Sequence, residues 1–578
     1  MRLTFDDVLR HLGEFGRYQK WMVFVLCLPG IAHGIRMMIS VFLLNIPNHR
    51  CAIPGYDNDT FNVQSESHAR LINATIPYVT RDGKLQLDRC HIYHDVDNGT
   101  SEGANRTVVG CQKWVYDKSV FESTVSTELN FVCDDATLAT HSQMIFMGGY
   151  FLGAFAAGAL GDKIGRKKAL YLCIMSLFIG GIIPQLVQQL HHVRHHPLLQ
   201  RNFYSRSLHH VFPMEIVGPS KRVWTGVMVQ VFFAVGMTIL SGAAYLIRDW
   251  HTLELAMAVP VGIFLVYWWV IPESPRWLMN EFRDDEAEVI IRRAADVNKV
   301  KLPDKLFEKQ TTEIETYDEK PKGNFFHLFT NPVMCIRTLI IFFNWLVVSM
   351  VYYGLSLNTD NLGAGSLHLN FLLVGLVEFP AYALSILLVN RLGRKFIHCA
   401  MMIIGGGSCI LTIFTILYAD QSIQWITVLL AMIGKLGAAA GFAIIYVFSS
   451  ELFPTVIRHS ATGASSSWAR VGGMIAPYIV DWGKIVGGDF GRALPLLVFG
   501  SLSVLAGLLA LLLPETLNRD LPETIEDGIK FGREPAHHGS THDEEKQRGL
   551  PLLSLRETTD HEENQSPIYR KLSAPVTA

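Results

Sequence analysis

The sequence predicts an all-α membrane protein built from two related halves of six helices each. Three observations support this prediction. Hydrophobic residues make up 49% of the 578 positions, whereas charged residues make up only 18%. The apolar residues gather in long runs, and such runs satisfy their backbone hydrogen bonds as membrane helices. Short motifs of the first half also recur, in the same order, in the second half.

The repeat is visible in three sets of motifs that lie at nearly constant offsets. A basic turn at residues 158–168 joins two apolar runs, and residues 390–395 do the same in the second half. A chain that contains one membrane unit twice is typical of a transporter, whose substrate binds between the halves near the bilayer midplane. The recurring positions are Gly165 with Gly393 and Arg166 with Arg394 (393 − 165 and 394 − 166, both 228), Glu215 with Glu451 and Arg222 with Arg458 (both 236), and residues 272–274 with 514–516 (242).

The chain begins with an amphipathic segment and a first apolar run. Residues 1–20 place hydrophobic side chains at helical spacing among charges, which predicts a short helix on the membrane surface. The N-terminal transmembrane half, residues 21–273, opens with an apolar run at 21–44. His33 and Arg36 lie within that run. They face the protein interior, reach outward to the membrane surface, or contact substrate, and the sequence leaves these alternatives open.

A polar loop at residues 45–137 is predicted to lie on the extracellular side. It holds four N-glycosylation sequons, at Asn58, Asn73, Asn98 and Asn105. The N-terminus is then cytoplasmic, and the basic turn at 158–168 agrees, because cytoplasmic loops carry an excess of Lys and Arg. The C-terminus is expected on the same side, and the plasma membrane is the expected location.

The same loop holds four of the nine cysteines, at Cys51, Cys90, Cys111 and Cys133. An exported loop favours two disulfides among them, and all three possible pairings remain open. A zinc site is the weaker interpretation because the spacings contain no CxxC motif. We therefore expect no metal and no cofactor.

The fourth span of the first half departs from a membrane helix. Residues 190–214 contain six histidines and three arginines, where the 236-residue offset pairs them with the apolar stretch 426–450. Each arginine costs about 2.5 to 3.5 kcal/mol at the centre of a membrane helix, so this segment would not insert alone. A histidine-rich segment that binds metal or senses pH is one interpretation. We favour an altered reading frame or gene-model fault, because the span length is nearly kept while its composition is lost.

The remaining elements are regular. Apolar runs near 140–160, 169–187, 224–246 and 253–271 supply the other helices of the first half, and charged residues 274–332 form a cytoplasmic linker. The C-terminal half, residues 333–516, has six apolar runs, and polar residues 517–578 are predicted to be a cytoplasmic tail. The six runs lie near 333–356, 368–389, 396–418, 425–450, 460–480 and 492–513.

Several motifs give the chain a specific resemblance. GALGDKIGRKK at 158–168 is similar to the loop between helices 2 and 3 of the major facilitator superfamily. The phrases CQKWVYD, LNFVCD, MEIVGP, PESPRWL, YYGL and ELFPT resemble the organic ion transporters of solute carrier family 22 over residues 1–530. The resemblance implies a major facilitator fold, transport of small organic ions by alternating access, and no enzymatic activity. Residues 190–214 depart from the family.

No catalytic motif competes with this interpretation. The sequence has no GxxxxGK[ST], HExxH or GxSxG motif, which argues against an enzyme and against an ATP-driven pump. The formal net charge is −2, and no basic patch interleaves with aromatic residues, so nucleic acid is not an expected partner. The expected partners are a small organic ion and the lipid bilayer, and the expected state is a monomer.

Ionisable residues inside the apolar runs of the second half are candidates for substrate binding, because each is costly unless it is paired or faces a cavity. Residues at helical spacing around them form three polar and aromatic faces, which predict a cavity wall, although helix packing would also explain aromatic faces. The candidate substrate-binding residues, from this spacing and from the family resemblance, are Trp345, Tyr352, Tyr353, Glu378, Lys435, Phe442, Tyr446, Ser466 and Arg470.

The resemblance also suggests the charge of the substrate. The position of Arg470 is basic in the anion and carnitine-type members of the family, which favours an organic anion or a carnitine-like zwitterion. Tyr382 stands where the anion transporters have a lysine, and this puts a dicarboxylate exchanger in doubt. A permanent pair between Arg470 and Glu378 would instead make Arg470 structural. The alternatives are an organic cation transporter, or a non-transporting paralogue or receptor because helix 4 is lost.

The recurring charged residues are predicted to form a cytoplasmic gate that closes in the outward-facing state. The competing interpretation is that the basic turns only set the topology. The candidate gate residues are Asp162, Arg166, Glu215, Arg222, Glu273 and Arg276 in the first half, and Arg394, Glu451, Arg458 and Glu515 in the second half.

Overall fold

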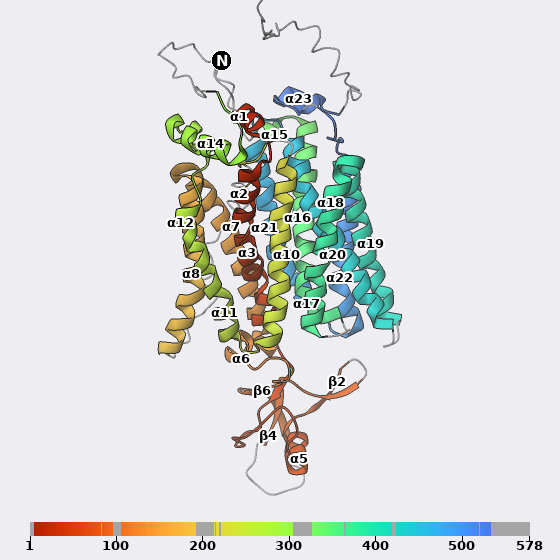
Figure 1. The fold of residues 1–578 in the computed structure, drawn as a ribbon. Helices are drawn as coiled ribbons and strands as arrows, with labels where there is room; N and C mark the ends of the chain where they lie inside the picture. The colour runs from red at the N-terminus through yellow and green to blue at the C-terminus, as the bar shows by residue number, and fades with distance from the viewer. Residues whose placement is uncertain are drawn as a thin grey trace, which may run out of the picture. The chain divides into compact units, whose positions relative to one another are not determined.

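Long helices that run alongside one another make up most of the chain (Figure 1). The computed structural model describes residues 5–81, 84–95, 106–191, 213, 215–218, 221–303, 326–362, 366–418, 423–519 and 521–532. These residues belong to one compact unit, which ends at Glu534. Most of the predicted abnormal span at 190–214, namely residues 192–212 and 214, and most of the predicted tail lie outside the described residues.

The first half begins with α2 to α4 and continues through α7, α8 and α10 to α12. Pro29 begins α3, and a proline lacks the N–H that would continue the preceding helix, so this span is divided. The bounds are α2 Arg17–Cys27, α3 Pro29–Met38, α4 Ser40–Leu43, α7 Thr137–Ile164, α8 Arg166–His191, α10 Arg222–Leu246, α11 Trp250–Ala258, the 3-10 helix η3 Val259–Val266 and α12 Tyr267–Val270.

The second half has a helix for each of the six predicted runs. The bounds are α16 Pro332–Leu357, the 3-10 helix η4 Asn358–Leu362, α17 Leu367–Leu376, α18 Glu378–Leu392, α19 Arg394–Tyr418, α20 Gln424–Leu452, α21 Arg458–Val486 and α22 Gly488–Ala510. In the described part of the chain, eight helical segments are long and apolar enough to cross a membrane. The helices α7, α8 and α21, of 28, 26 and 29 residues, are long enough as well.

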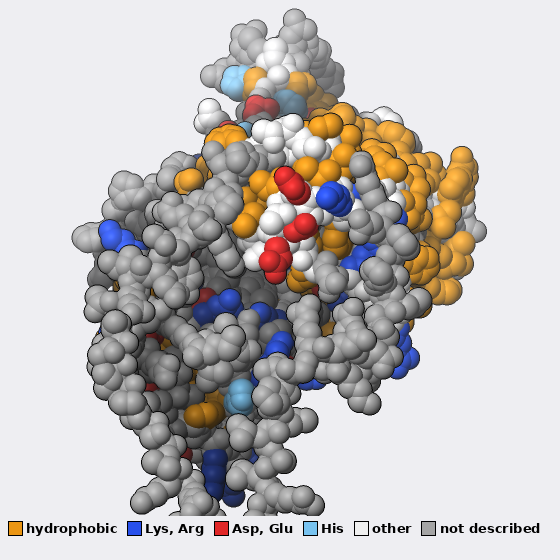
Figure 2. Space-filling model, turned by 90° about the horizontal axis from the view of Figure 1, so that it is seen from above, with side chains coloured by type: hydrophobic (Ala, Val, Ile, Leu, Met, Phe, Trp, Pro, Cys, Tyr) orange, Lys and Arg blue, Asp and Glu red, His pale blue; other side chains and the backbone are white. Residues whose placement is uncertain are grey.

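Short helices lie at the end of the bundle that we call the linker end (Figure 1). They are α1 Phe5–Leu12, α13 Pro275–Asn280, α14 Asp284–Asn298, α15 His327–Thr330 and α23 Ile525–Lys530. Figure 2 views this end and shows charged side chains within the outline and hydrophobic side chains along one flank. Exposed hydrophobic residues recur at helical spacing on α19, at Phe396, Ile404, Leu411 and Phe414, as expected for a face that meets lipid.

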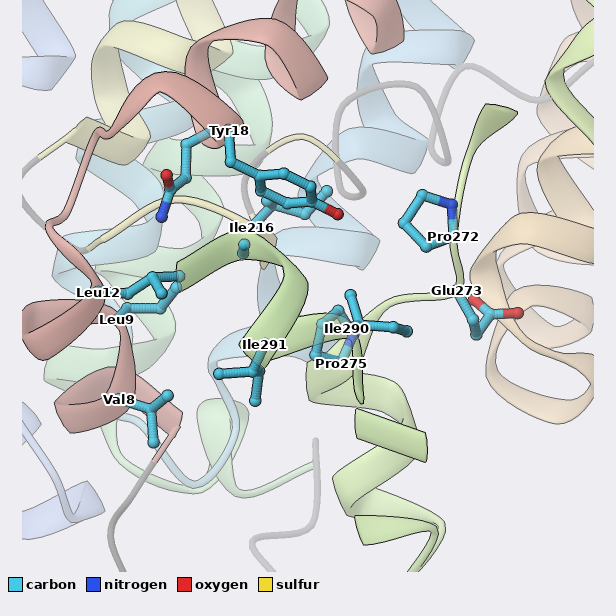
Figure 3. Close-up of a pocket in the computed structure, with 12 residues that line it drawn as sticks. Val8, Leu9, Leu12, Tyr18, Ile216, Pro272, Glu273, Pro275, Ile290 and Ile291 are labelled. Atoms are coloured by element: carbon cyan, nitrogen blue, oxygen red, sulfur yellow. The ribbon is translucent and has the colours of Figure 1, made fainter. Parts of the chain in front are cut away.

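Figure 3 shows a pocket at the linker end, with an empty volume of about 410 Å³. Its lining includes Leu9 and Leu12 of α1 and Ile290 and Ile291 of α14. Among the described lining residues Glu273 alone is charged, and its Oε1 accepts hydrogen bonds from the backbone N–H groups of Lys167 and Ser274. An apolar pocket whose carboxylate is already bonded is suited to packing α1 against α14 and offers little to an organic ion.

A small folded region at the opposite end, the loop end, is formed by residues 45–137. Disulfides join Cys51 to Cys111 and Cys90 to Cys133, which decides among the three pairings and excludes these cysteines as zinc ligands. Three antiparallel strand pairs surround α5 Glu66–Thr75, with α6 Val125–Glu128 and the 3-10 helix η1 Cys133–Ala136 following. The pairs are β1 His49–Cys51 with β6 Trp114–Tyr116, β2 Tyr78–Arg81 with β3 Lys84–Leu87, and β4 His91–Asp95 with β5 Arg106–Gly110.

Hydrogen bonds attach the base of this loop domain to the segment between α10 and α11. Arg248 Nε donates to the carbonyl of Val120 at 3.0 Å, and Ser123 Oγ donates to Asp249 Oδ1 at 2.5 Å. His251 Nε2 lies 2.9 Å from Glu128 Oε1. These partners all belong to the first half of the chain, so the loop domain is fixed to that half.

An ion cluster stabilises the interior of the loop domain. The Asp59 side chain, 5% exposed, accepts hydrogen bonds from Arg50 and from the Ile53 backbone, and His68 Nε2 lies 2.9 Å from Asp59 Oδ1. Burial alone would raise the pKa of the Asp59 carboxyl. The hydrogen bonds from Arg50, Ile53 and His68 outweigh burial and hold that pKa below its ordinary value.

This cluster makes the loop domain sensitive to acid. Because the folded pKa is lowered, the stabilisation is present above the unfolded pKa of about 3.9 and is lost as pH falls through the folded value. We expect the Asp59→Asn variant to lose protection already at neutral pH and to show a flatter acid response. Hydrogen exchange of residues 49–81 between about pH 3 and pH 7 measures this. Equal protection of variant and wild type at neutral pH would contradict it.

The two basic turns share one backbone conformation, a glycine with a positive φ angle. Gly165 has φ +104° and Gly393 has φ +98°, a region that residues with a Cβ rarely adopt. The tight turns bring the next helix against a carboxylate. Glu515 accepts hydrogen bonds from the N–H groups of Arg394 and Lys395 at 2.8 and 3.1 Å, and Glu273 accepts from that of Lys167 at 2.9 Å. Each acid thus caps the N-terminus of α19 or α8, where the helix dipole favours a negative charge.

Gly393→Ala should destabilise the second half. A Cβ at this position would lie 2.4 Å from Glu515 Oε2 and require a strained φ, so we expect a loss of at least about 1 to 2 kcal/mol. Gly407→Ala is the matched control, because a Cβ there meets no atom within 4 Å and alanine favours the helix. Thermal unfolding of the purified variants, followed by tryptophan fluorescence, measures both. Equal unfolding temperatures for the two variants would refute this role of Gly393.

Candidate functional site

Five aromatic side chains from α16 and α20 form one cluster in the second half. Trp345 packs on Phe442 and Tyr446, with ring centroids 6.0 and 4.4 Å apart. Tyr352 packs on Phe442 at 5.5 Å and on Tyr353 at 5.2 Å. The sequence predicted a shared helix face for Trp345 and Tyr352 and another for Phe442 and Tyr446, and the family resemblance added Tyr353. The structure brings all five together into what we call the aromatic cluster.

A buried ion pair lies beside the aromatic cluster. Lys435 Nζ is 2.9 Å from Glu378 Oε1, and both side chains are 0% exposed. The ammonium also donates to Ser356 Oγ at 2.8 Å and lies 3.2 Å from the centroid of the Tyr352 ring. Glu378 accepts two further hydrogen bonds, from the hydroxyls of Tyr352 at 2.5 Å and Tyr382 at 2.9 Å. Both charges are therefore compensated, as burial requires.

This network includes two residues that sequence reasoning missed or placed differently. Ser356 follows Tyr352 by one helical turn, so the helix face that contains Trp345 and Tyr352 extends to it. Tyr382 was considered only because the anion transporters have a lysine at its position. It follows Glu378 by four residues, however, and this spacing places both side chains on one face of α18. Extending each helix face by one more turn would have found both residues.

Arg470 of α21 lies near its own helix backbone. Its Nη1 donates to the carbonyl oxygen of Ser466 at 2.6 Å and also to the Ser466 hydroxyl. The side chain is partly buried. Glu378, the proposed rival partner of Arg470, is instead bonded to Lys435, so the structure contains an ion pair different from the one considered.

The aromatic cluster lies where the two halves meet. The Tyr352 hydroxyl is 3.9 Å from Met237 Sδ of α10. At Gly473 of α21, an added Cβ would lie 3.3 Å from the Tyr353 ring and 3.7 Å from Met147 Sδ of α7, so these groups surround one point. Toward the loop end, Ser241 of α10 donates to the carbonyl of His368 of α17 at 2.7 Å. The two halves thus also touch on the loop-end side of the cluster.

Comparison with known proteins identifies the family. The profile of the family described as "Sugar (and other) transporter" matches residues 95–196 and 211–527, and leaves out 197–210 within the histidine-rich segment. The chain is 40% identical over 553 residues to the "Organic cation transporter protein" of Drosophila melanogaster, covering 92% of this chain and 96% of that one. It is 33% identical over 548 residues to "Solute carrier family 22 member 21" of Mus musculus, covering 91% and 93%. The chain belongs to solute carrier family 22.

Further relatives agree with this family assignment. The chain is 32% identical over 558 residues to the human "Organic cation/carnitine transporter 2", covering 92% of this chain and 96% of that one. The solved structure of the proton:xylose symporter XylE, of the major facilitator superfamily, covers 89% of this chain and 99% of its own, with a TM-score of 0.54 at 17% identity. The predicted major facilitator fold and family are confirmed. Since the family consists of transporters, the chain is not an enzyme.

In this family member, the two polar residues of the first span face the protein interior. Arg36 Nη1 is 2.7 Å from Glu254 Oε1 of α11, with side chains 5% and 3% exposed. His33 is buried, and its ring lies 5.8 Å from that of Tyr150 and 5.5 Å from that of Phe233. Of the alternatives that the sequence left open for these two residues, the structure shows that both face the protein interior. Glu254 was missed, although a carboxylate at the start of an apolar run was the signal for it.

The recurring charged residues form one cluster in each half. Arg166 Nε is 3.1 Å from Glu215 Oε1, and Arg394 Nε is 3.0 Å from Glu451 Oε2. Ser274 donates to Glu215 at 2.7 Å, as Thr516 donates to Glu451 at 2.6 Å. The structure thus shows the same charged cluster twice, with the pairs described here lying inside their own half of the transporter. Closure between the halves stays a prediction, as do the contributions of Arg222, Arg276 and Arg458.

The Glu378–Lys435 pair gives a stability test. Glu378→Gln leaves the ammonium of Lys435 buried without its carboxylate, and we expect the free energy of unfolding to fall by about 3 to 5 kcal/mol. The double variant Glu378→Gln/Lys435→Met removes both charges and should recover most of the loss. Unfolding temperatures of the purified variants measure this. A double variant less stable than Glu378→Gln alone would show that the pair is not the relevant interaction.

Proposed function

We propose that this protein is a plasma-membrane secondary transporter that moves a carnitine-like zwitterion by alternating access. The observation that carries the proposal is the aromatic cluster beside the Glu378–Lys435 pair, where the two halves meet. Inverted or repeated halves of transporters bind substrate at such an interface. Relatives named organic cation and organic cation/carnitine transporters support a small organic ion as the substrate.

The aromatic cluster suits a quaternary ammonium. Faces of Tyr and Trp rings attract a cation by about 0.5 to 2 kcal/mol each. The Lys435 ammonium over the Tyr352 ring is an instance of this contact inside the protein itself. A substrate ammonium would use the faces of Phe442 and Tyr446, whose ring centroids are 5.7 Å apart, and that of Tyr353, which packs on the neighbouring Tyr352.

Arg470 is proposed to select the carboxylate of the substrate. A guanidinium keeps its charge at membrane depth and offers a planar pair of donors that fits a carboxylate. The carboxylate considered as its permanent partner, Glu378, is bonded to Lys435 instead. A plain organic anion would use Arg470 but not the aromatic rings, so the zwitterion accounts for more of the site.

An organic cation transporter is the second candidate function. The relative that is 40% identical carries that name, and the aromatic cluster with Glu378 would serve a cation without a carboxylate. Substitution of Arg470 separates the two candidates, because a cation does not need this guanidinium.

The loop end is proposed to be extracellular, with both termini in the cytoplasm. The sequons at Asn58 and Asn73 and both disulfides lie on the loop domain, as expected in an exported region. With that orientation the contact of Ser241 with His368 lies on the extracellular side, and the proposed gate at the linker end closes the cytoplasmic side in the outward-facing state.

Arg470→Asp should shift substrate preference. We expect uptake of L-carnitine to fall at least about tenfold, because a bidentate carboxylate contact becomes a like-charge contact. Uptake of tetraethylammonium should be retained or increased. The measurement is uptake of both labelled compounds into cells, normalised to surface abundance.

The control is Ser467→Ala, which removes from the same helix a hydroxyl that donates to the carbonyl of Gly463, and which leaves the Arg470 guanidinium in place. An Arg470→Asp variant with an unchanged ratio of L-carnitine to tetraethylammonium uptake would eliminate the zwitterion proposal. Surface delivery of wild type without uptake of any organic cation, anion or zwitterion would favour the non-transporting alternative. A transcript that encodes an apolar span at 190–214 would explain such a result.

Asp162→Asn tests the gate. Asp162 Oδ1 accepts from Arg166 Nη1 at 2.5 Å, while its side chain is 72% exposed, so it contributes little to stability. If it acts in closure, the transport rate should fall more than surface abundance does. A proportional loss of both would indicate that the basic turn only sets topology.

A further inference from the structure

A polar pocket opens at the loop end, between the halves and apart from the aromatic cluster. It has an empty volume of about 700 Å³, which includes the open space at its mouth. Helices α4, α7, α17 and α21 and the η4 segment contribute to its wall. We call it the loop-end pocket, and its polar lining residues are Ser40, Asn45, Thr140, Gln143, Asp360, Asp481 and Lys484.

The inner wall of the pocket holds polar groups that lack a partner. Gln143 is only 4% exposed, and neither its amide oxygen nor its amide nitrogen has a hydrogen-bond partner among the described residues. Ser40 Oγ, on a side of the pocket formed by α4, also lacks a partner there. Leaving a buried amide unpaired costs about 1 to 3 kcal/mol, so these groups indicate a site for a polar ligand.

The mouth of the pocket is charged. Asp360 is exposed and Asp481 is partly buried, and both line the pocket together with the exposed Lys484. Asp360 Oδ2 accepts one long hydrogen bond, 3.5 Å from Asn45 Nδ2. Two carboxylates and one ammonium leave a net negative mouth, which attracts a cation.

One layer of side chains, to which Tyr353 of the aromatic cluster itself contributes, lies between the loop-end pocket and the rest of that cluster. Gln143 precedes Met147 by one turn of α7, and Pro477 follows Gly473 by one turn of α21. Tyr353, Met147 and Gly473 meet in that layer. A solute in the loop-end pocket therefore lies against the layer that has to open before the solute reaches the cluster.

We propose that the loop-end pocket is a second binding site, which takes small organic cations through their ammonium group. Asp360 and Asp481 hold the ammonium, and the Gln143 amide meets a polar group of the same solute. The proposal rests on the proposed function in one respect, namely that the bound solute is one that the protein then transports. Its binding chemistry is independent of transport, and so is the test below.

Thiol protection measures this binding without uptake. Thr140→Cys places a thiol in the pocket of the full-length protein on intact cells, where sulfonatoethyl methanethiosulfonate can reach it from outside. The background is low, since the described free cysteines Cys27, Cys173, Cys399 and Cys409 are buried and Cys335 is half-buried. We expect tetraethylammonium to slow the labelling of Thr140→Cys. Val63→Cys, on the loop domain and 60% exposed, is the control that it should not protect.

Variants of the mouth identify the groups that bind. On the Thr140→Cys background, Asp360→Asn or Asp481→Asn should raise the half-protecting concentration about threefold, and the double variant about tenfold. Lys484→Gln should lower it, because a like charge is removed. Labelling of Val63→Cys in each variant shows that the protein is folded at the surface.

Several outcomes would overturn the proposal. Protection that is unchanged in the double variant but lost in Tyr352→Ala would place the ligand at the aromatic cluster. Protection by succinate rather than by tetraethylammonium, lost in Lys484→Gln, would reverse the charge of the ligand. Absence of protection with uptake intact would refute the pocket and leave the proposed function standing. Protection without uptake would support the pocket and refute the function.

Discussion

A charge inside a membrane helix has to be compensated by the protein, and several long-range contacts in this fold satisfy that constraint. Arg36 is bonded to Glu254, which is 218 positions away in the sequence. Lys435 of α20 is bonded to Glu378 of α18. At the linker end, Glu273 and Glu515 compensate the N–H groups at the starts of α8 and α19. The arrangement of the helices follows from these pairs as much as from apolar packing, because an unpaired charge would be far more costly than a missing methyl group.

The repeat of the sequence has a direct structural meaning. The offsets of 228, 236 and 242 align residues that build the same cluster twice, with a glycine of positive φ, a capping glutamate and an arginine–glutamate pair in each half. The aromatic cluster and the Glu378–Lys435 pair lie in the second half and follow no such repeat. The duplicated parts therefore share one architecture in both halves, whereas the proposed substrate site lies in a part that differs between them.

The sequence allowed the prediction of each long helix to within a few residues, because apolar runs and basic turns are local signals. The positions of Tyr352, Phe442 and Tyr446 on shared faces were also predictable from helical spacing. The partners that these residues bond on other helices were not predictable from the sequence. Glu378 was considered for Arg470 but is bonded to Lys435, and neither the Cys51–Cys111 nor the Cys90–Cys133 pairing could be selected. Such contacts depend on how helices are oriented around their axes, which spacing along one helix does not determine.

The attachment of the loop domain has a consequence for observing the transport cycle. Arg248, Asp249 and His251 bond its base to the first half, and both disulfides hold its interior together. The domain is therefore tied mainly to one half. A small tilt of that half becomes a larger displacement at the far tip of the domain. A fluorescent label on the tip and another on the second half would report the state of a single molecule without a probe near the substrate.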